Sequence, residues 1–220
     1  MDSLQRTAAL GQLTELADDL DVRLSQERLQ QFETYLDTLL FWRQRLSLTT
    51  ADTAPKIIQH HLMDSLYVTP HIPDGARVAD IGSGAGFPGI VLAITCPTAR
   101  ITLIESRRKR ANFLRTVIRE TRLDNADVAE DRAETIGSQR YDVSVSRALG
   151  SLDRFLKLSA ALLTRSGLAI AMKGPRNDPE PVTPGFSDPS VVDYALPGGV
   201  KRRLLLFRAT PSGAVSRETP

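Results

Sequence analysis

Residues 77–89 read RVADIGSGAGFPG. Apolar Val78, Ala79 and Ile81 predict a short buried strand. The alternating glycines that follow predict a tight turn, and Pro88 suits the first turn of a helix. Glycine at alternate positions lets the backbone approach a ligand with no Cβ in the way, and the free N–H groups at the helix start form a polar cradle. The stretch therefore predicts a strand, a ligand loop and a helix start, with a nucleotide-like cofactor as the guest.

Two cofactors fit this loop. Gly84, Gly86 and Gly89 satisfy the GxGxxG pattern of dinucleotide-binding folds. Asp80, two residues before Gly82, disfavours a pyrophosphate beside the loop and suits the cationic amino acid end of S-adenosylmethionine. We favour the methyl donor for this reason. An ordinary strand and turn of an α/β protein is the other interpretation of the stretch.

The bulk composition sets the class of protein. With 220 residues, 41% of them hydrophobic, the chain is long enough for one α/β domain and a modest extension. A formal net charge of +2 does not by itself indicate nucleic acid. One cysteine, no signal peptide and no apolar run of bilayer length predict a cytoplasmic protein with no membrane partner. Three histidines and Cys96 offer no ligand set of the usual spacing, so we expect no metal site.

Residues 1–74 are predicted to form a helical extension. Apolar residues at helical spacing indicate a helix over residues 4–20, and Ser25 is the predicted N-cap of a second helix. A third predicted helix, over about residues 55–68, carries His61 and Asp64. These two lie three residues apart and hence on one helical face, where they could form a hydrogen-bonded pair.

The end of the second predicted helix combines aromatic and basic residues. Phe41 and Trp42, followed by Arg43 and Arg45, could stack on RNA bases and clamp the backbone. Aromatic residues near a helix end are more often part of the core, so packing against the domain is the favoured interpretation.

A second acid strengthens the prediction of a cofactor site. Residues 100–105, RITLIE, predict the second strand, which ends at Glu105. Glu105 lies 19 residues beyond Gly86, at the carboxyl end of a neighbouring strand, where it can accept hydrogen bonds from the ribose hydroxyls of an adenosine. Both candidate cofactors contain such a ribose, so Glu105 does not choose between them.

Basic residues are concentrated directly after this strand. Residues 107–122 hold seven Arg or Lys residues against one acid, Glu120. Projected on a helix, four arginines share one stripe opposite the apolar side: Arg108, Arg115, Arg119 and Arg122. The stripe is expected either to be a solvated surface or to bind phosphate.

Two later strands end in basic residues. Residues 141–146 alternate between apolar and polar, which predicts a strand running into Arg147. An arginine at the carboxyl end of an interior strand points into the ligand crevice, so Arg147 is a candidate functional residue. A fifth predicted strand, over residues 167–172, ends at Lys173, which could touch phosphate or reach solvent.

The C-terminal part of the chain predicts two closing strands, over residues 191–196 and 204–207. A second basic cluster lies between and after them: Lys201, Arg202, Arg203 and Arg208. We expect the α/β domain to span residues 75–209 and residues 210–220 to form a disordered tail.

Taken together, these motifs resemble the bacterial 16S ribosomal RNA guanine-N7 methyltransferase family. The resemblance covers about residues 41–208. It rests on six segments: WRQRLSLT at 42–49, HLMDS at 61–65, the loop at 80–89, Lys109-Arg110 with Phe113-Leu114, Ser146-Arg147-Ala148, and Lys173-Gly174. Two positions depart from the family pattern, because Ser47 stands where asparagine is usual and Val200-Lys201-Arg202 replaces a usual G-E-R.

The resemblance implies a class I S-adenosylmethionine-dependent methyltransferase fold, which is Rossmann-like, with a mostly parallel seven-stranded sheet and N-terminal helices packed on it. It also implies cofactor-contacting positions: Gly82, Phe87, Ala133, Glu134 and Arg147. The pattern of the residues themselves adds further cofactor candidates: Asp80, Ser83, Gly84, Gly86 and Glu105. His61, Asp64, Ser65 and Lys173 match family positions near the site. The candidate catalytic residues are His61, Asp64 and Lys173 from this set, with Arg147 from its place at the end of the predicted fourth strand.

The implied reaction is methyl transfer to N7 of a guanine. Guanine N7 has an in-plane lone pair and no proton, so the attack needs no general base and orientation is the main task. The implied partners are 16S rRNA or the 30S subunit, and we expect a monomer. Two alternatives stay open: a nicotinamide-dependent oxidoreductase that uses the same glycine loop, and a noncatalytic ribosome-binding factor that keeps the basic stripe.

Overall fold

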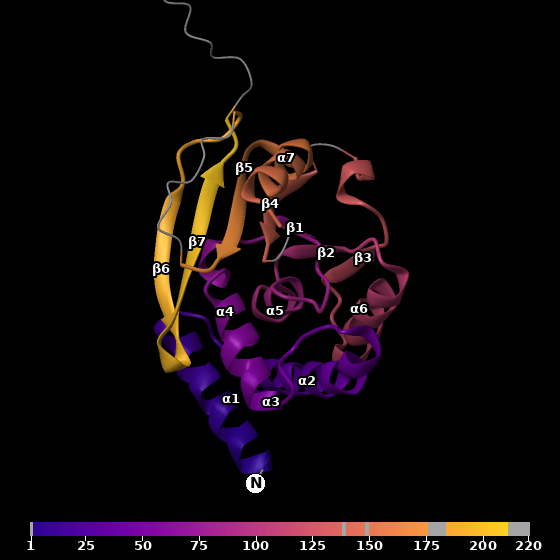
Figure 1. The fold of residues 1–220 in the computed structure, drawn as a ribbon, viewed down its shortest axis with the longest axis vertical. Helices are drawn as coiled ribbons and strands as arrows, with labels where there is room; N and C mark the ends of the chain where they lie inside the picture. Colours follow the sequence, from indigo (N-terminus) through magenta and orange to yellow (C-terminus); the bar gives the residue numbers. More distant parts are fainter. Residues whose placement is uncertain (1, 138–139, 148–149, 176–183, 211–220) are drawn as a thin grey trace, which may run out of the picture.

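The computed structural model describes residues 2–137, 140–147, 150–175 and 184–210. Its centre is a seven-stranded sheet in the order β3-β2-β1-β4-β5-β7-β6 (Figure 1). The strands are β1 (Arg77–Ile81), β2 (Arg100–Ile104), β3 (Ala126–Ala129), β4 (Tyr141–Ser146), β5 (Leu163–Lys173), β6 (Ser190–Leu196) and β7 (Val200–Arg208). The first five run parallel, and β7 is antiparallel to both β5 and β6. The predicted α/β class with a mostly parallel seven-stranded sheet is confirmed.

Helices cover the sheet and extend it at the N-terminus. The long ones are α1 (Asp2–Asp19), α2 (Gln26–Leu46), α5 (Gly89–Thr95), α6 (Arg108–Thr121) and α7 (Leu152–Leu162). The short ones are α3 (Ala54–Ile57), the π-helical turn η1 (Ile58–Leu62), α4 (Met63–Leu66), and the 3₁₀ turns η2 (Thr69–His71), η3 (Ala133–Thr135) and η4 (Pro197–Gly199). Figure 1 shows α1, α2 and α3 together at one end of the molecule, with the β6–β7 hairpin along one side.

Local sequence explains where α2 begins and ends. The Oγ of Ser25 accepts a hydrogen bond from the N–H of Arg28 at 3.3 Å, which confirms the predicted N-cap. Ser47 adopts a left-handed conformation with φ of 48° and ends the helix. The predicted third helix forms as a helical run over residues 54–66, with the π-helical turn η1 at its centre.

The core has one apolar cluster on each face of the sheet. Alternation along β1 sends Val78 into the cluster that contains α2, α5 and α6 side chains, and sends Ala79 and Ile81 into the cluster that contains α7 side chains. Tyr35 of α2 is fully buried, and its hydroxyl donates to the carbonyl oxygen of Ala85 at 2.6 Å. The N-terminal helices therefore share a core with the sheet and contact the glycine loop directly.

Two strands are longer than the sequence pattern predicted. β5 begins at Leu163, immediately after α7, rather than at residue 167. β7 begins at Val200 rather than at residue 204, and it pairs Arg202 with Tyr194 of β6. The run Lys201–Arg203 lacks apolar alternation, but backbone hydrogen bonds to a neighbouring strand do not require it. Of the predicted tail, only Thr210 lies within the described residues.

Alanine substitutions at two glycines, Gly89 and Gly11, test the packing beneath the loop. An added Cβ at Gly89 would overlap Leu103 Cδ2 and come within 2.5 Å of Asp80 Oδ2, whereas one at Gly11 of α1 would meet no atom within 4 Å. We expect Gly89→Ala to lower the free energy of unfolding by about 1–3 kcal/mol because the site is already full. Gly11→Ala should raise it by about 0.5–1 kcal/mol because alanine is the better helix former. Urea denaturation measures both, and equal effects would contradict the packing argument.

Candidate active site at the carboxyl edge of the sheet

The loop after β1 is held in place by its own backbone. The N–H groups of Gly82 and Ser83 both donate to the carbonyl oxygen of Ile104, at 2.9 and 3.1 Å. Gly86 has φ of 97°, and an added Cβ there would lie 2.7 Å from Ile90 Cγ1, so only glycine fits this turn. The loop is thereby tied to the end of β2, where Glu105 follows.

Asp80 lies beneath this loop and not in an open crevice. Its side chain is buried, Oδ2 accepts a hydrogen bond from the N–H of Gly89 at 3.1 Å, and Ser83 Oγ donates to the Asp80 carbonyl oxygen at 2.9 Å. The other carboxyl oxygen, Oδ1, is buried and has no hydrogen-bond partner among the described residues. Burial raises the pKa of Asp80 to about 7 against the lowering effect of these hydrogen bonds.

Glu105 is buried and lines a cleft beside the loop. Its Oε2 accepts from the N–H of Gly84 at 3.1 Å and its Oε1 from the N–H of Arg107 at 2.8 Å. The cleft has a volume of about 510 Å³. Four predicted cofactor positions are among its lining residues: Gly82, Glu105, Ala133 and Glu134. The remaining predicted positions, including Asp80, Phe87 and Arg147, lie outside that lining.

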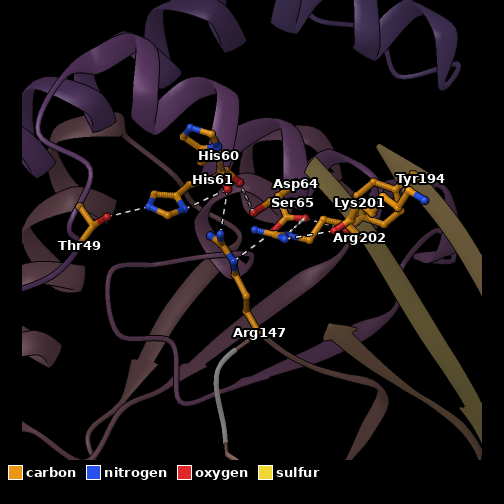
Figure 2. Close-up of polar contacts among 9 residues, drawn as sticks. All are labelled: Thr49, His60, His61, Asp64, Ser65, Arg147, Tyr194, Lys201 and Arg202. Carbon is orange, nitrogen blue, oxygen red and sulfur yellow. Dashed lines mark hydrogen bonds and ion pairs between the residues drawn. The ribbon is translucent and has the colours of Figure 1, made fainter. Parts of the chain in front are cut away.

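Arg147 joins β4 to the N-terminal helices. It follows directly after β4 and reaches toward the helical run that carries His60 and Asp64 (Figure 2). Its Nε lies 3.1 Å from Asp64 Oδ2, and its Nη2 donates to the carbonyl oxygen of His60 at 2.8 Å. The guanidinium also lies over the ring of Phe87, 5.7 Å from the ring centre. Arg147 is thus oriented by three groups from two segments.

Asp64, on α4, contacts side chains from β6, from β7 and from the residue that follows β4. Its carboxylate is 2% exposed, and besides Arg147 it accepts a hydrogen bond from the hydroxyl of Tyr194 at 2.7 Å. The Tyr194 hydroxyl contacts Asp64 Oδ1, and Arg202 Nε of β7 lies 3.8 Å from this oxygen. The ring of Tyr194 stacks on Tyr67 with centres 3.8 Å apart. The sequence pattern missed Tyr194, which lies 130 residues from Asp64 in a strand with no motif.

The predicted hydrogen bond between His61 and Asp64 is wrong. The Nε2 of His61 lies 2.6 Å from Thr49 Oγ1, and its Nδ1 lies 3.0 Å from the carbonyl oxygen of His60. A carbonyl only accepts, so Nδ1 carries the proton and the Thr49 hydroxyl donates to Nε2. The two residues separate because η1 follows an i→i+5 repeat, in which residues three apart no longer stack above one another.

His61 is held as a neutral imidazole. Burial, and after it the positive charge of Arg147, lowers the pKa of His61 to about 3. Its ring packs on Phe87 with centres 4.8 Å apart. With both nitrogens in hydrogen bonds, the side chain connects the segment after α2 to the helical run above β4.

The basic residues are less free than their sequence suggested. Arg115 pairs with Glu130 at 2.6 Å and Arg119 with Glu120 at 2.9 Å. Glu130 follows β3, beyond the window in which only one acid was counted. Arg203 pairs with Asp193 of β6 at 3.1 Å. Lys173, at the end of β5, donates to the carbonyl oxygen of Gly150 at 3.4 Å.

The described ranges contain neither a metal-binding cluster nor a membrane-spanning helix. Among residues 2–137, 140–147, 150–175 and 184–210, no group of three or more His, Cys, Asp or Glu side chains could hold a metal ion. Within the same ranges, no helix is both long and apolar enough to cross a membrane.

Comparison with known proteins places the chain in a family. The sequence model of rRNA small subunit methyltransferase G matches residues 28–184. The chain belongs to this family. The ribosomal RNA small subunit methyltransferase G of Chromobacterium violaceum is 35% identical over 182 residues, covering 81% of this chain and 87% of the relative. The protein of the same name from Cronobacter sakazakii is 34% identical over 204 residues, covering 91% and 98%.

Solved structures share the fold. A SAM-dependent methyltransferase from Aquifex aeolicus has a TM-score of 0.55 at 15% identity, covering 71% of this chain and 94% of that chain. The putative methyltransferase yhhF from Escherichia coli has a TM-score of 0.52 at 18% identity, covering 66% and 82%. The class I methyltransferase fold and the family resemblance are both confirmed. Neither alternative, the nicotinamide-dependent oxidoreductase or the noncatalytic factor, is supported.

The buried carboxyl of Asp80 makes a pH prediction. With a pKa near 7, against an ordinary value of 3.8, the folded protein holds a proton there that the unfolded chain loses above about pH 4. The free energy of unfolding therefore falls as the pH rises from 4 to 7, because Asp80 resists ionisation in the folded protein. We expect Asp80→Asn, which keeps an acceptor for Gly89, to gain on the order of 2 kcal/mol relative to the native chain between pH 5 and pH 8. Urea denaturation measures it; Asp18→Asn, at an exposed position of α1, should show no such change.

The hydroxyl of Tyr194 makes a stability prediction. Tyr194→Phe removes a hydrogen bond to a buried carboxylate and leaves the stack on Tyr67 intact. We expect a loss of about 1.5–3 kcal/mol in the free energy of unfolding. Tyr141→Phe is the control, since that buried ring makes no hydroxyl hydrogen bond within the described part of the chain. Equal losses in the two variants would show that Asp64 does not depend on Tyr194.

Proposed function

We propose that this chain transfers the methyl group of S-adenosylmethionine to N7 of a guanine in 16S rRNA of the small ribosomal subunit. The observation that carries the proposal is the cleft between the glycine loop and Glu105, found in a chain of the rRNA small subunit methyltransferase G family. Its relatives are named as methyltransferases of the small-subunit ribosomal RNA. The cleft supplies a cofactor site and the family supplies the substrate class.

The residues present fit the cofactor. Ile104, Ala133 and Leu158 give the cleft apolar walls for an adenine, and the Glu105 carboxylate that lines it can accept from ribose hydroxyls. Asp80 Oδ1, buried and without a partner among the described residues, leaves an unmet polar atom below the loop. When bound, S-adenosylmethionine supplies an electrophilic methyl group on a sulfonium. Of the predicted loop positions, Gly82 lines the cleft. The other three would shape the loop around the cofactor, because the N–H groups of Ser83, Gly84 and Gly86 already donate to Ile104, Glu105 and Ser83.

The chemistry of N7 agrees with the groups around Arg147. A lone pair without a proton needs no general base, and a neutral His61 with both nitrogens engaged is not placed to act as one. A covalent route through cysteine is disfavoured, because Cys96 follows α5 at the opposite edge of the sheet. The work left to the protein is to hold two reactants in line.

We assign different roles to the candidate catalytic residues. Arg147 and Lys173 end neighbouring parallel strands, and they would orient the guanine or its phosphate. Asp64 and His61 are positioning residues, since Asp64 holds the Arg147 guanidinium and His61 holds the adjoining segment. This division rests on contacts within the chain, and the target base would have to leave its stack to reach the groups around Arg147.

The substrate surface would be the basic residues beside this edge. Arg108 begins α6, which starts at the carboxyl edge, and among the described residues it forms no ion pair. Together with Lys201, which lies near the start of β7, beside the part that pairs with the end of β5, and forms no ion pair within the described residues, it can contact the phosphate backbone of a bulky rRNA substrate. Arg115 and Arg119 contribute less, because each is already paired with an acid.

Methyl transfer tests the proposal directly. Labelled S-adenosylmethionine is mixed with 30S subunits and with naked 16S rRNA, and the product nucleoside is identified by mass. Labelled 7-methylguanosine is the expected product. Label in a different nucleoside would refute the N7 assignment, and cofactor binding without label in either RNA would point to a different methyl acceptor.

A matched pair of variants tests the cofactor role of Glu105. Glu105→Gln removes the charge that ribose hydroxyls would contact and replaces one of the two oxygens that accept backbone N–H groups by a donor, so we expect the dissociation constant for S-adenosylmethionine to rise about tenfold or more. Glu130→Gln is the control, because Glu130 pairs with Arg115 outside the cleft. Calorimetric titration measures both, and unchanged affinity in Glu105→Gln would remove this assignment.

A further inference from the structure

An exposed aromatic ring stands at the end of α2. Phe41 is 62% exposed, although large apolar side chains of this chain are mostly buried. Trp42 meets it edge-on, with ring centres 6.1 Å apart and planes at 79°, and the Arg45 guanidinium lies 4.4 Å from the ring centre. We name Phe41, Trp42 and Arg45 the aromatic platform. A single exposed apolar residue is common on protein surfaces. Here the exposed ring is paired with a guanidinium, so the surface offers both a stacking face and a positive charge.

The direction of α2 places the aromatic platform at the functional edge of the sheet. Gln31, near the start of α2, donates to the carbonyl oxygen of Thr121 at the end of α6, which lies at the amino edge. Tyr35, one turn later, reaches the glycine loop at the carboxyl edge. Phe41 follows six residues after Tyr35, about 9 Å farther along the helix axis. The platform therefore projects past the glycine loop.

The segment after the platform leads directly to the candidate site. Ser47 ends the helix, and Thr49 then donates to His61, whose ring packs on Phe87. Phe87 in turn lies beneath the Arg147 guanidinium. Thr49 comes four residues after Arg45, so the segment that follows the platform is tied through these contacts to Arg147.

The charge of the aromatic platform suits a polyanion. Residues 41–46, FWRQRL, carry two arginines and no acid. Arg45 is exposed and forms no ion pair within the described ranges, so its guanidinium is available to a phosphate while its plane stays over the ring. A folded protein partner or a second copy would need a broader apolar patch, and here one ring is exposed.

We propose that the aromatic platform stacks an unpaired base of the rRNA substrate while Arg45 contacts the adjoining phosphate. This rests on the proposed function and names a second anchor for its substrate, apart from the cleft. Aromatic side chains take up splayed RNA bases in this way, with guanidinium groups adding to the stack. The anchor fixes the distance between one unpaired nucleotide and the target guanine.

Steady-state methyl transfer to 30S subunits separates this anchor from the catalytic groups. We expect Phe41→Ala to raise the KM for the subunit about tenfold and to leave kcat and the affinity for S-adenosylmethionine unchanged. Phe41→Trp should restore the native KM because it keeps a stacking face. Leu4→Ala is the matched control, since Leu4 is a 77% exposed residue on α1. A native KM in Phe41→Ala, with native enzyme active, would overturn the anchor alone.

A photo-crosslink identifies the occupant independently of turnover. The full chain carrying benzoylphenylalanine at position 41 is irradiated with 30S subunits. A crosslink to an unpaired nucleotide of 16S rRNA is expected. A crosslink only to a ribosomal protein or to a second copy of this chain would overturn the anchor, as would no crosslink at all. Failure of the native chain to methylate or bind any RNA would instead remove the proposed function, and the anchor with it.

Discussion

The buried carboxylate of Asp64 is the interaction on which the arrangement of the site depends. It joins the helical run of the N-terminal extension to Arg147 after β4, to Tyr194 in β6 and to Arg202 in β7. A buried charge is tolerated only when its partners are complete, and removing one partner of such a pair costs about 3–5 kcal/mol. The extension, the central strands and the closing hairpin are consequently locked to one another around the guanidinium of Arg147.

Three buried carboxyls illustrate how burial assigns different roles to one chemical group. Asp64 is matched by cations and a hydroxyl. Glu105 accepts from two backbone N–H groups and lines the cleft. Asp80 has one backbone donor and one oxygen with no partner in the described part of the chain, and burial raises its pKa to about 7. The first is suited to hold a side chain, the second to receive a ligand, and the third to respond to pH.

Much of the frame could be predicted from local pattern. The glycine loop, the strand ends at Glu105 and Arg147, and the cap at Ser25 all depend on residues adjacent in the chain. The start of β7 could not be predicted, because its basic residues have no apolar alternation and its pairing comes from β6. The prediction that His61 pairs with Asp64 was wrong for a related reason. It assumed α-helical spacing, whereas His61 lies in a π-helical turn and its hydrogen-bond partner is Thr49.

By itself, the sequence determined the class of fold, the family and the identity of most candidate residues, because these depend on short motifs and on the periodicity of apolar side chains. Only the tertiary structure decided which residues meet. Tyr194 and Asp64, 130 residues apart, form their hydrogen bond because the antiparallel hairpin folds beside α4, and Glu130 neutralises Arg115 because β3 lies next to α6. Contacts between distant segments follow from the packing of whole elements, which no local pattern encodes.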